Sequence, residues 1–129
     1  MSYVFQSPTM KIYIGGDGGY DTHFADIGKK FGPIDLAILE DGQYDVKWKY
    51  IHLLPAQVLQ AAKDLHAKRL FPVHSSKFAL ANHPWDEPLI KITELNQTVK
   101  IPLVTPMIGE FVNLKDDKQV FKSWWIGVK

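Results

Sequence analysis

The chain has 129 residues, of which 46% are hydrophobic and 22% are charged, proportions typical of an ordinary globular protein. Its formal net charge is +1 and it contains no cysteine. This composition excludes disulfides and thiolate zinc sites, and it gives no positive field to draw the chain to nucleic acid. At this length we expect a single domain over residues 1–129, with a core large enough to fold without covalent cross-links.

The N-terminal residues contain no basic stretch followed by an apolar one, so they are not a signal peptide. No apolar run approaches the roughly 18 residues that a membrane span requires. We therefore expect a cytoplasmic protein without a membrane span. Residues 3–5 already have the composition of a buried strand, which suggests a piece of a longer protein.

The first half of the chain begins with two predicted strands, residues 3–6 and 10–14, which form a hairpin across Ser7-Pro8-Thr9. After a glycine-rich loop, Asp21 or Thr22 can cap a short helix that ends at Gly32-Pro33.

The second half continues with an apolar strand over residues 34–39 and a turn at Glu40-Asp41-Gly42. Further elements are predicted in order along the rest of the chain: a helix from Pro55 to about Lys68, a strand at 70–73, a helix at about 85–97, and short strands around Gly109 and Asp116-Asp117. This order favours an α/β layered fold with the strand-to-helix loops gathered on one edge.

Asp17 is the most informative residue, because it lies between two pairs of glycines directly after a predicted strand. Glycines let the backbone turn sharply and leave space around the carboxylate, which can bridge two metal ions. The alternative is a solvated Asp-Gly turn, and the spacing alone leaves both interpretations open.

His74 follows the apolar run at residues 70–73, so it also lies at the carboxyl end of a predicted strand, where α/β sheets place their ligands. Aspartate and histidine together suit zinc, iron or manganese. His52 lies just before a helix start, from which it can reach into a cleft. The alternatives are a histidine satisfied in the core or a loop for His74, and a half-exposed loop histidine for His52.

Four motifs in order carry a family resemblance: Gly16-Asp17-Gly18-Gly19-Tyr20, the segment from Phe24 to Ala37, His52-x-x-Pro55, and Pro72-Val73-His74 followed by Phe78-Ala79-Leu80. This set resembles the C-terminal half of the metallo-β-lactamase superfamily. It is most similar to the branch of N-acylphosphatidylethanolamine phospholipase D and related bacterial metal-dependent hydrolases. The resemblance covers residues 3 to about 112.

The resemblance implies an αβ/βα sandwich with two metal ions, usually zinc, at one edge. In that family the residue matching Asp17 bridges the metals, and the one matching His74 ligates one of them. The residue matching His52 lines the active site and assists substrate binding or proton transfer. The family's His-x-His-x-Asp-His motif does not occur in this chain, so most of the metal ligands are missing.

Two functions follow as expectations. The first is the C-terminal part of a zinc-dependent hydrolase that acts on a phosphodiester, lactone or amide, with little activity as the isolated chain. The second is a non-catalytic α/β domain that pairs with a separately encoded N-terminal half or with itself. A small-molecule substrate and an oligomeric state are expected, and a nucleic-acid partner is not.

Overall fold

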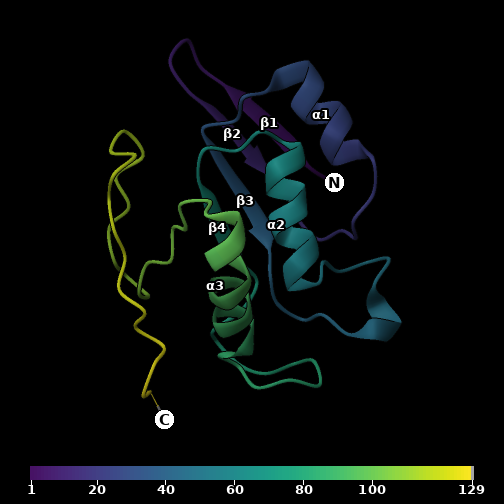
Figure 1. The fold of residues 1–129 in the computed structure, drawn as a ribbon, viewed down its shortest axis with the longest axis vertical. Helices are drawn as coiled ribbons and strands as arrows, with labels where there is room; N and C mark the ends of the chain where they lie inside the picture. The colour runs from purple at the N-terminus through teal and green to yellow at the C-terminus, as the bar shows by residue number, and fades with distance from the viewer. Residues whose placement is uncertain (129) are drawn as a thin grey trace.

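The computed structural model describes residues 1–128. Within these residues the chain forms four strands, three α-helices and one short 3-10 helix (Figure 1): β1 (Tyr3–Gln6), β2 (Lys11–Ile14), α1 (His23–Phe31), β3 (Leu36–Glu40), η1 (Val46–Trp48), α2 (Pro55–Asp64), β4 (Leu70–Val73) and α3 (Glu87–Val99). The predicted α/β fold is confirmed.

The strands form a mixed sheet in the order β1-β2-β3-β4. β1 and β2 are antiparallel, with Tyr3 opposite Ile14, as the predicted hairpin requires. β2, β3 and β4 run parallel to one another. Parallel strands end on the same side of a sheet, so the loops that follow β2, β3 and β4 all begin at one edge. We call this the carboxyl edge of the sheet.

The three α-helices cover one face of the sheet (Figure 1). Alternate strand residues point toward them, and Tyr13, Leu39 and Leu70 form a buried core with helix residues such as Val58 and Ile92. This alternation follows from the two-residue repeat of a β-strand. The core holds the parallel strands rigidly and therefore fixes where the carboxyl edge lies.

No helix of the described part of the chain lies on the other face of the sheet, which is also apolar. One row across the four strands consists of Tyr3, Ile14, Ile38 and Phe71, which are paired in register. Tyr3 is 51% exposed, and the other three are half-buried. We call this row the open face.

Two helices differ in extent from the prediction. α2 ends at Asp64 rather than near Lys68, because His66 takes a positive φ of 53° and the backbone leaves the helix there. Lys68 N–H then bonds to Ile34 O at 2.9 Å, next to an isolated parallel bridge between Ile34 and Ala67. α3 begins two residues later and ends two residues later than predicted.

The short strands predicted around Gly109 and Asp116-Asp117 were wrong. Between residues 102 and 128 the only β-pairing is an isolated bridge from Leu103 to Leu70. A strand needs a neighbouring edge to bond with, and the chain moves away from β4 after that bridge. The Arg69 guanidinium holds this tail instead, donating to the carbonyl oxygens of Leu114 and Asp116 at 2.8 and 2.9 Å.

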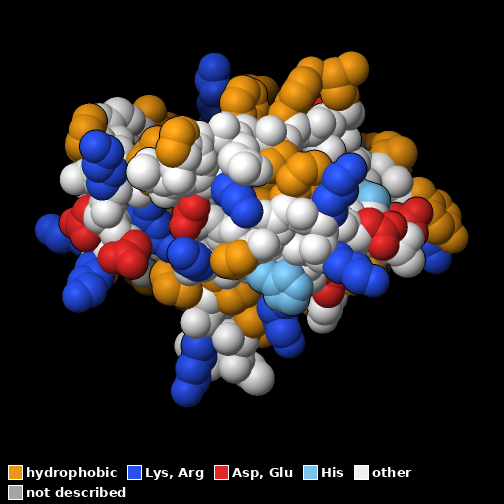
Figure 2. Space-filling view, turned by 90° about the horizontal axis from the view of Figure 1, so that it is seen from above, with side chains coloured by type: hydrophobic (Ala, Val, Ile, Leu, Met, Phe, Trp, Pro, Cys, Tyr) orange, Lys and Arg blue, Asp and Glu red, His pale blue; other side chains and the backbone are white. Residues whose placement is uncertain are grey.

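The surface shown in Figure 2 carries basic side chains interspersed with acidic and hydrophobic ones. This mixture agrees with the formal net charge of +1 and differs from the basic stripe typical of nucleic-acid binding. None of the helices among residues 1–128 has the length and apolar composition needed to cross a bilayer.

Candidate metal centre

The two residues singled out as metal ligands lie together at the carboxyl edge. Asp17 is in the loop after β2, and His74 directly follows β4. Their Oδ1 and Nδ1 atoms are 3.8 Å apart. The Asp17 side chain is 69% exposed, so an ion or a ligand can approach it. The sheet thus brings side chains 57 positions apart in the sequence to one point, while their role as ligands stays a prediction.

The loops after β3 and β4 pack against each other very closely. A Cβ atom at Gly42 would lie 1.9 Å from the carbonyl oxygen of His74, so only glycine fits there. His74 itself has a positive φ of 72°, a conformation that costs a non-glycine residue energy and is often found at functional sites. The two loops therefore hold the His74 backbone in one strained position.

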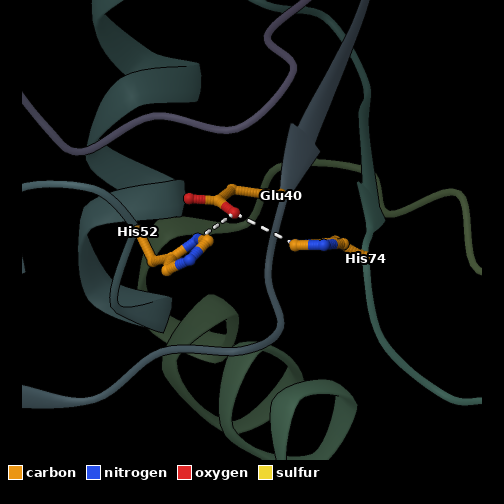
Figure 3. A group of neighbouring side chains, drawn as sticks. All are labelled: Glu40, His52 and His74. Carbon is orange, nitrogen blue, oxygen red and sulfur yellow. Dashed lines mark hydrogen bonds and ion pairs between the residues drawn. The ribbon is translucent and has the colours of Figure 1, made fainter. Parts of the chain in front are cut away.

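Glu40 is a site residue that the sequence reading missed. It is the last residue of β3 and only 2% exposed. Figure 3 shows its carboxylate between two imidazoles. Its Oε2 atom lies 2.7 Å from His52 Nδ1 and 3.1 Å from His74 Nδ1. The available signal was a carboxylate ending an otherwise apolar strand, which was interpreted as part of a turn.

His52 reaches the cluster from the loop that leads into α2. Its backbone N–H bonds to Trp48 O at 2.9 Å, which anchors it to the 3-10 helix η1. Its side chain is 16% exposed, and its ring centre is 5.7 Å from that of His74. Leu54 offers no capping oxygen, but the Gln57 side chain accepts from Leu54 N–H at 2.9 Å and supports the helix start.

Asp41 follows Glu40 and has the opposite kind of environment. It is fully buried, and neither of its carboxylate oxygens has a hydrogen-bond partner among the described residues. Burial raises the pKa of Asp41 well above its usual range, and the neighbouring charge of Glu40 raises it further. The end of β3 thus carries one carboxylate surrounded by donors and one without any.

The donor atoms at this edge suit a metal ion. Glu40, His52 and His74 each place one ligand atom within 4.8 Å of the others, and Asp17 adjoins them. Oxygen and imidazole nitrogen are donors that zinc accepts.

The other histidines lie outside this group. His83 stacks on Tyr44 and contacts Glu87, and His23 begins α1 at the surface.

Comparisons with known proteins assign the chain to a family. A family described as "Beta-lactamase superfamily domain" matches residues 1–75, a range that includes Asp17, Glu40, His52 and His74. The outer membrane protein RomA of Klebsiella pneumoniae is 53% identical over 76 residues, which make up 59% of this chain and 58% of that protein.

Two further relatives are similar to this chain in sequence. An uncharacterized protein of Mycobacterium tuberculosis is 33% identical over 127 residues, 96% of this chain and 34% of its own length. N-acyl-phosphatidylethanolamine-hydrolyzing phospholipase D 1 of Caenorhabditis elegans is 32% identical over 89 residues, 66% of this chain and 25% of that protein. The chain therefore spans between a quarter and about three-fifths of these relatives.

Solved structures show the same fold. The metallo hydrolase Igni18 of Ignicoccus hospitalis superimposes with a TM-score of 0.57 and 20% identity, over 81% of this chain and 40% of that one. At that identity the match shows the fold alone, and it agrees with the mixed sheet and helical layer described above.

Proposed function

This chain belongs to the metallo-β-lactamase superfamily, and from that premise we propose that it forms the C-terminal part of a zinc-dependent hydrolase. The observation that carries the proposal is the convergence of Asp17 and His74, 3.8 Å apart at the carboxyl edge. In this proposal the Asp17 carboxylate and the His74 imidazole hold metal. A cytoplasmic location is part of the proposal, since a chain without cysteine suits a reducing compartment.

Each residue then has a distinct task. Zinc, when bound, lowers the pKa of a water molecule so that a hydroxide nucleophile exists near neutral pH. The exposed Asp17 carboxylate would bind the metal directly, and the His74 imidazole, whose backbone is strained, would bind it from the end of β4. His52, beside His74 but only 16% exposed, contacts the substrate or moves a proton.

The substrate class is a small molecule with a phosphodiester, lactone or amide group. All three bonds are attacked by hydroxide and develop negative charge on oxygen, so one metal-dependent site can serve any of them. The choice among them depends on pocket residues, which a shared fold does not supply.

We expect residues 1–129 alone to hold zinc weakly and to have little or no hydrolytic activity. Asp17 and His74 are two ligands, whereas zinc sites have three or four protein ligands. Residues outside this chain, whether in the same polypeptide or in another, would complete the centre. Zinc content measured by elemental analysis after dialysis tests this expectation, and two tightly held ions per chain would overturn it.

Matched variants locate whatever zinc the chain does bind. Asp17→Asn and His74→Ala should each reduce that binding about tenfold or more, since each removes one of few ligands. His23→Ala removes a surface histidine outside the cluster and should leave it unchanged. Equal zinc binding in all three variants would contradict the proposed site.

The second candidate function is a non-catalytic domain that acts by pairing with a complementary half or with itself. The open face supports it, because this apolar row is only partly covered and apolar surface of this kind is typical of interfaces. Light scattering combined with size exclusion tests this candidate: an oligomer is expected, and a stable monomer at high concentration would count against it.

A further inference from the structure

We infer that Glu40 is a positioning residue that sets the tautomer of two histidines at once. Its carboxylate holds the proton on Nδ1 of both His52 and His74 and leaves Nε2 of each ring as the nitrogen that binds metal or accepts a proton. The chemical meaning of this role rests on the proposed function, but the tautomers themselves do not.

The hydrogen bonds to Glu40 use its full capacity. Oε1 accepts from Leu53 N–H at 2.9 Å and from Gly18 N–H at 3.4 Å. Oε2 accepts from the two imidazoles at 2.7 and 3.1 Å. An ionised carboxylate has about four lone-pair positions, so these four donors occupy all of them. At 2% exposure, a buried charge is tolerated because it is bonded in this way.

The direction of the histidine bonds follows from the chemistry of the partner. An ionised carboxylate only accepts, so the Nδ1 atoms of His52 and His74 must carry the hydrogens. Within residues 1–128 no hydrogen bond reaches Nε2 of either ring, which leaves a lone pair on each. A carboxylate behind a ligating histidine fixes the ring orientation and raises its basicity.

Glu40, whose lone-pair positions are all occupied by donors, differs in this respect from Asp17. Both are carboxylates at the carboxyl edge, but Asp17 is 69% exposed and accepts no hydrogen bond within the described residues. An ion can therefore bind Asp17 directly, whereas binding Glu40 would break existing bonds in a buried position. The geometry assigns contact with the metal to Asp17 and the supporting role to Glu40.

Glu40 also joins three separate parts of the chain. It ends β3, contacts the loop before α2 through His52 and Leu53, and contacts the end of β4 through His74. The two rings therefore keep a fixed relation to each other, with centres 5.7 Å apart. A change at Glu40 should disturb both histidines together.

The decisive variant is Glu40→Gln, which has the same shape. The N–H groups of Leu53 and Gly18 would keep the amide oxygen at the Oε1 position, so the amide NH2 would face the two rings. An NH2 group donates, and each Nδ1 would then have to accept. Both rings should change from predominantly Nδ1–H to predominantly Nε2–H.

Two-bond ¹H–¹⁵N spectra of the metal-free chain at about pH 9, where histidine is neutral, distinguish the two tautomers. His83 serves as an internal control, because its Nδ1 lies 2.9 Å from Pro84 O, which forces Nδ1–H without any contact to Glu40. Wild-type rings of His52 and His74 in the Nε2–H form would overturn the inference even if the variant does not fold. Unchanged tautomers in a folded Glu40→Gln variant would also overturn it.

Zinc titration adds a second readout. Glu40→Gln should weaken zinc binding about ten- to a hundredfold, the usual effect of losing an outer-shell partner. A complete loss of zinc without a tautomer change would identify Glu40 as a ligand and contradict the inference. If the wild-type chain shows the expected tautomers but Asp17→Asn and His74→Ala leave its zinc binding unchanged, the proposed function fails and the role of Glu40 stands.

Discussion

The two ends of β3 place aspartates in opposite environments. At the amino end, Asp35 accepts from Lys11 N–H at 2.8 Å and pairs with Lys68 Nζ at 3.0 Å. Burial by itself would raise the pKa of Asp35, but these bonds outweigh it and lower the pKa overall. At the carboxyl end, neither carboxylate oxygen of Asp41 has a hydrogen-bond partner among residues 1–128, and burial raises the pKa of this carboxyl. Asp35 before β3 therefore stabilises the fold, whereas Asp41 after β3 destabilises it, next to the candidate site.

Among the variants that test this contrast, the largest effect is expected for Gly42→Ala, at the carboxyl end of β3. The new Cβ would meet the His74 backbone at 1.9 Å, and backbone atoms cannot turn away as a flexible side chain can. We expect a loss of about 3 kcal/mol in the free energy of unfolding. The bond between Glu40 and His74 should be lost with it. Urea denaturation measures the first effect and histidine spectra the second.

Gly18→Ala is the matched control for that variant. Gly18 lies in the loop next to Asp17, and a Cβ there would meet no atom within 4 Å. Its effect on stability should be below about 0.5 kcal/mol, as for most surface changes. Equal destabilisation by the two variants would show that the close contact at Gly42 does not hold the edge together.

The next largest effect is expected for Asp41→Asn, which should increase the free energy of unfolding rather than decrease it. Because the folded-state pKa of Asp41 is raised, the folded chain holds a proton that the unfolded chain releases above about pH 4. The wild type therefore loses stability as pH rises above that value, and the variant does not. We expect the variant to be more stable by about 1–2 kcal/mol at pH 8. A difference that does not grow between pH 4 and pH 8 in thermal melts would refute the assignment.

Asp35→Asn should have a smaller effect in the opposite direction. The lowered pKa of Asp35 means that its carboxylate stabilises the fold above about pH 4, and this contribution is lost as pH falls through the folded-state pKa. Removing the charge should cost about 1 kcal/mol at pH 7 and almost nothing at pH 2. Chemical denaturation at both pH values tests this. A constant cost would assign the role of Asp35 to packing.

Much of the architecture was predictable from local patterns. The hairpin, the helix stop at Gly32-Pro33, the helix start at Pro55 and the strand at 70–73 all depend on residues near one another in the sequence. The strands predicted after residue 102 failed because a strand needs a neighbour, and local composition does not say whether an edge is available. α2 is shorter than predicted for a similar reason. The residues after it pair with Ile34, which lies far away in the sequence, and this pairing was not visible in local composition.

Some residues of the candidate site were likewise predicted from the sequence, and one was missed. Asp17 stood out by its flanking glycines and His74 by its place after an apolar strand, and the family resemblance, not these surroundings alone, made both of them predicted metal ligands. Glu40 was not, because its partners His52, Leu53 and His74 lie 12, 13 and 34 positions away.

The sequence by itself therefore determined the family, the order of strands and α-helices up to the end of α3, and two metal-capable residues, since these depend on short-range patterns and ordered motifs. Only the tertiary structure decided which side chains meet. Parallel pairing of β2, β3 and β4 brings their carboxyl ends to one edge of the sheet. In the buried position there, Glu40 accepts four hydrogen bonds, whereas its neighbour Asp41 accepts none from the described residues.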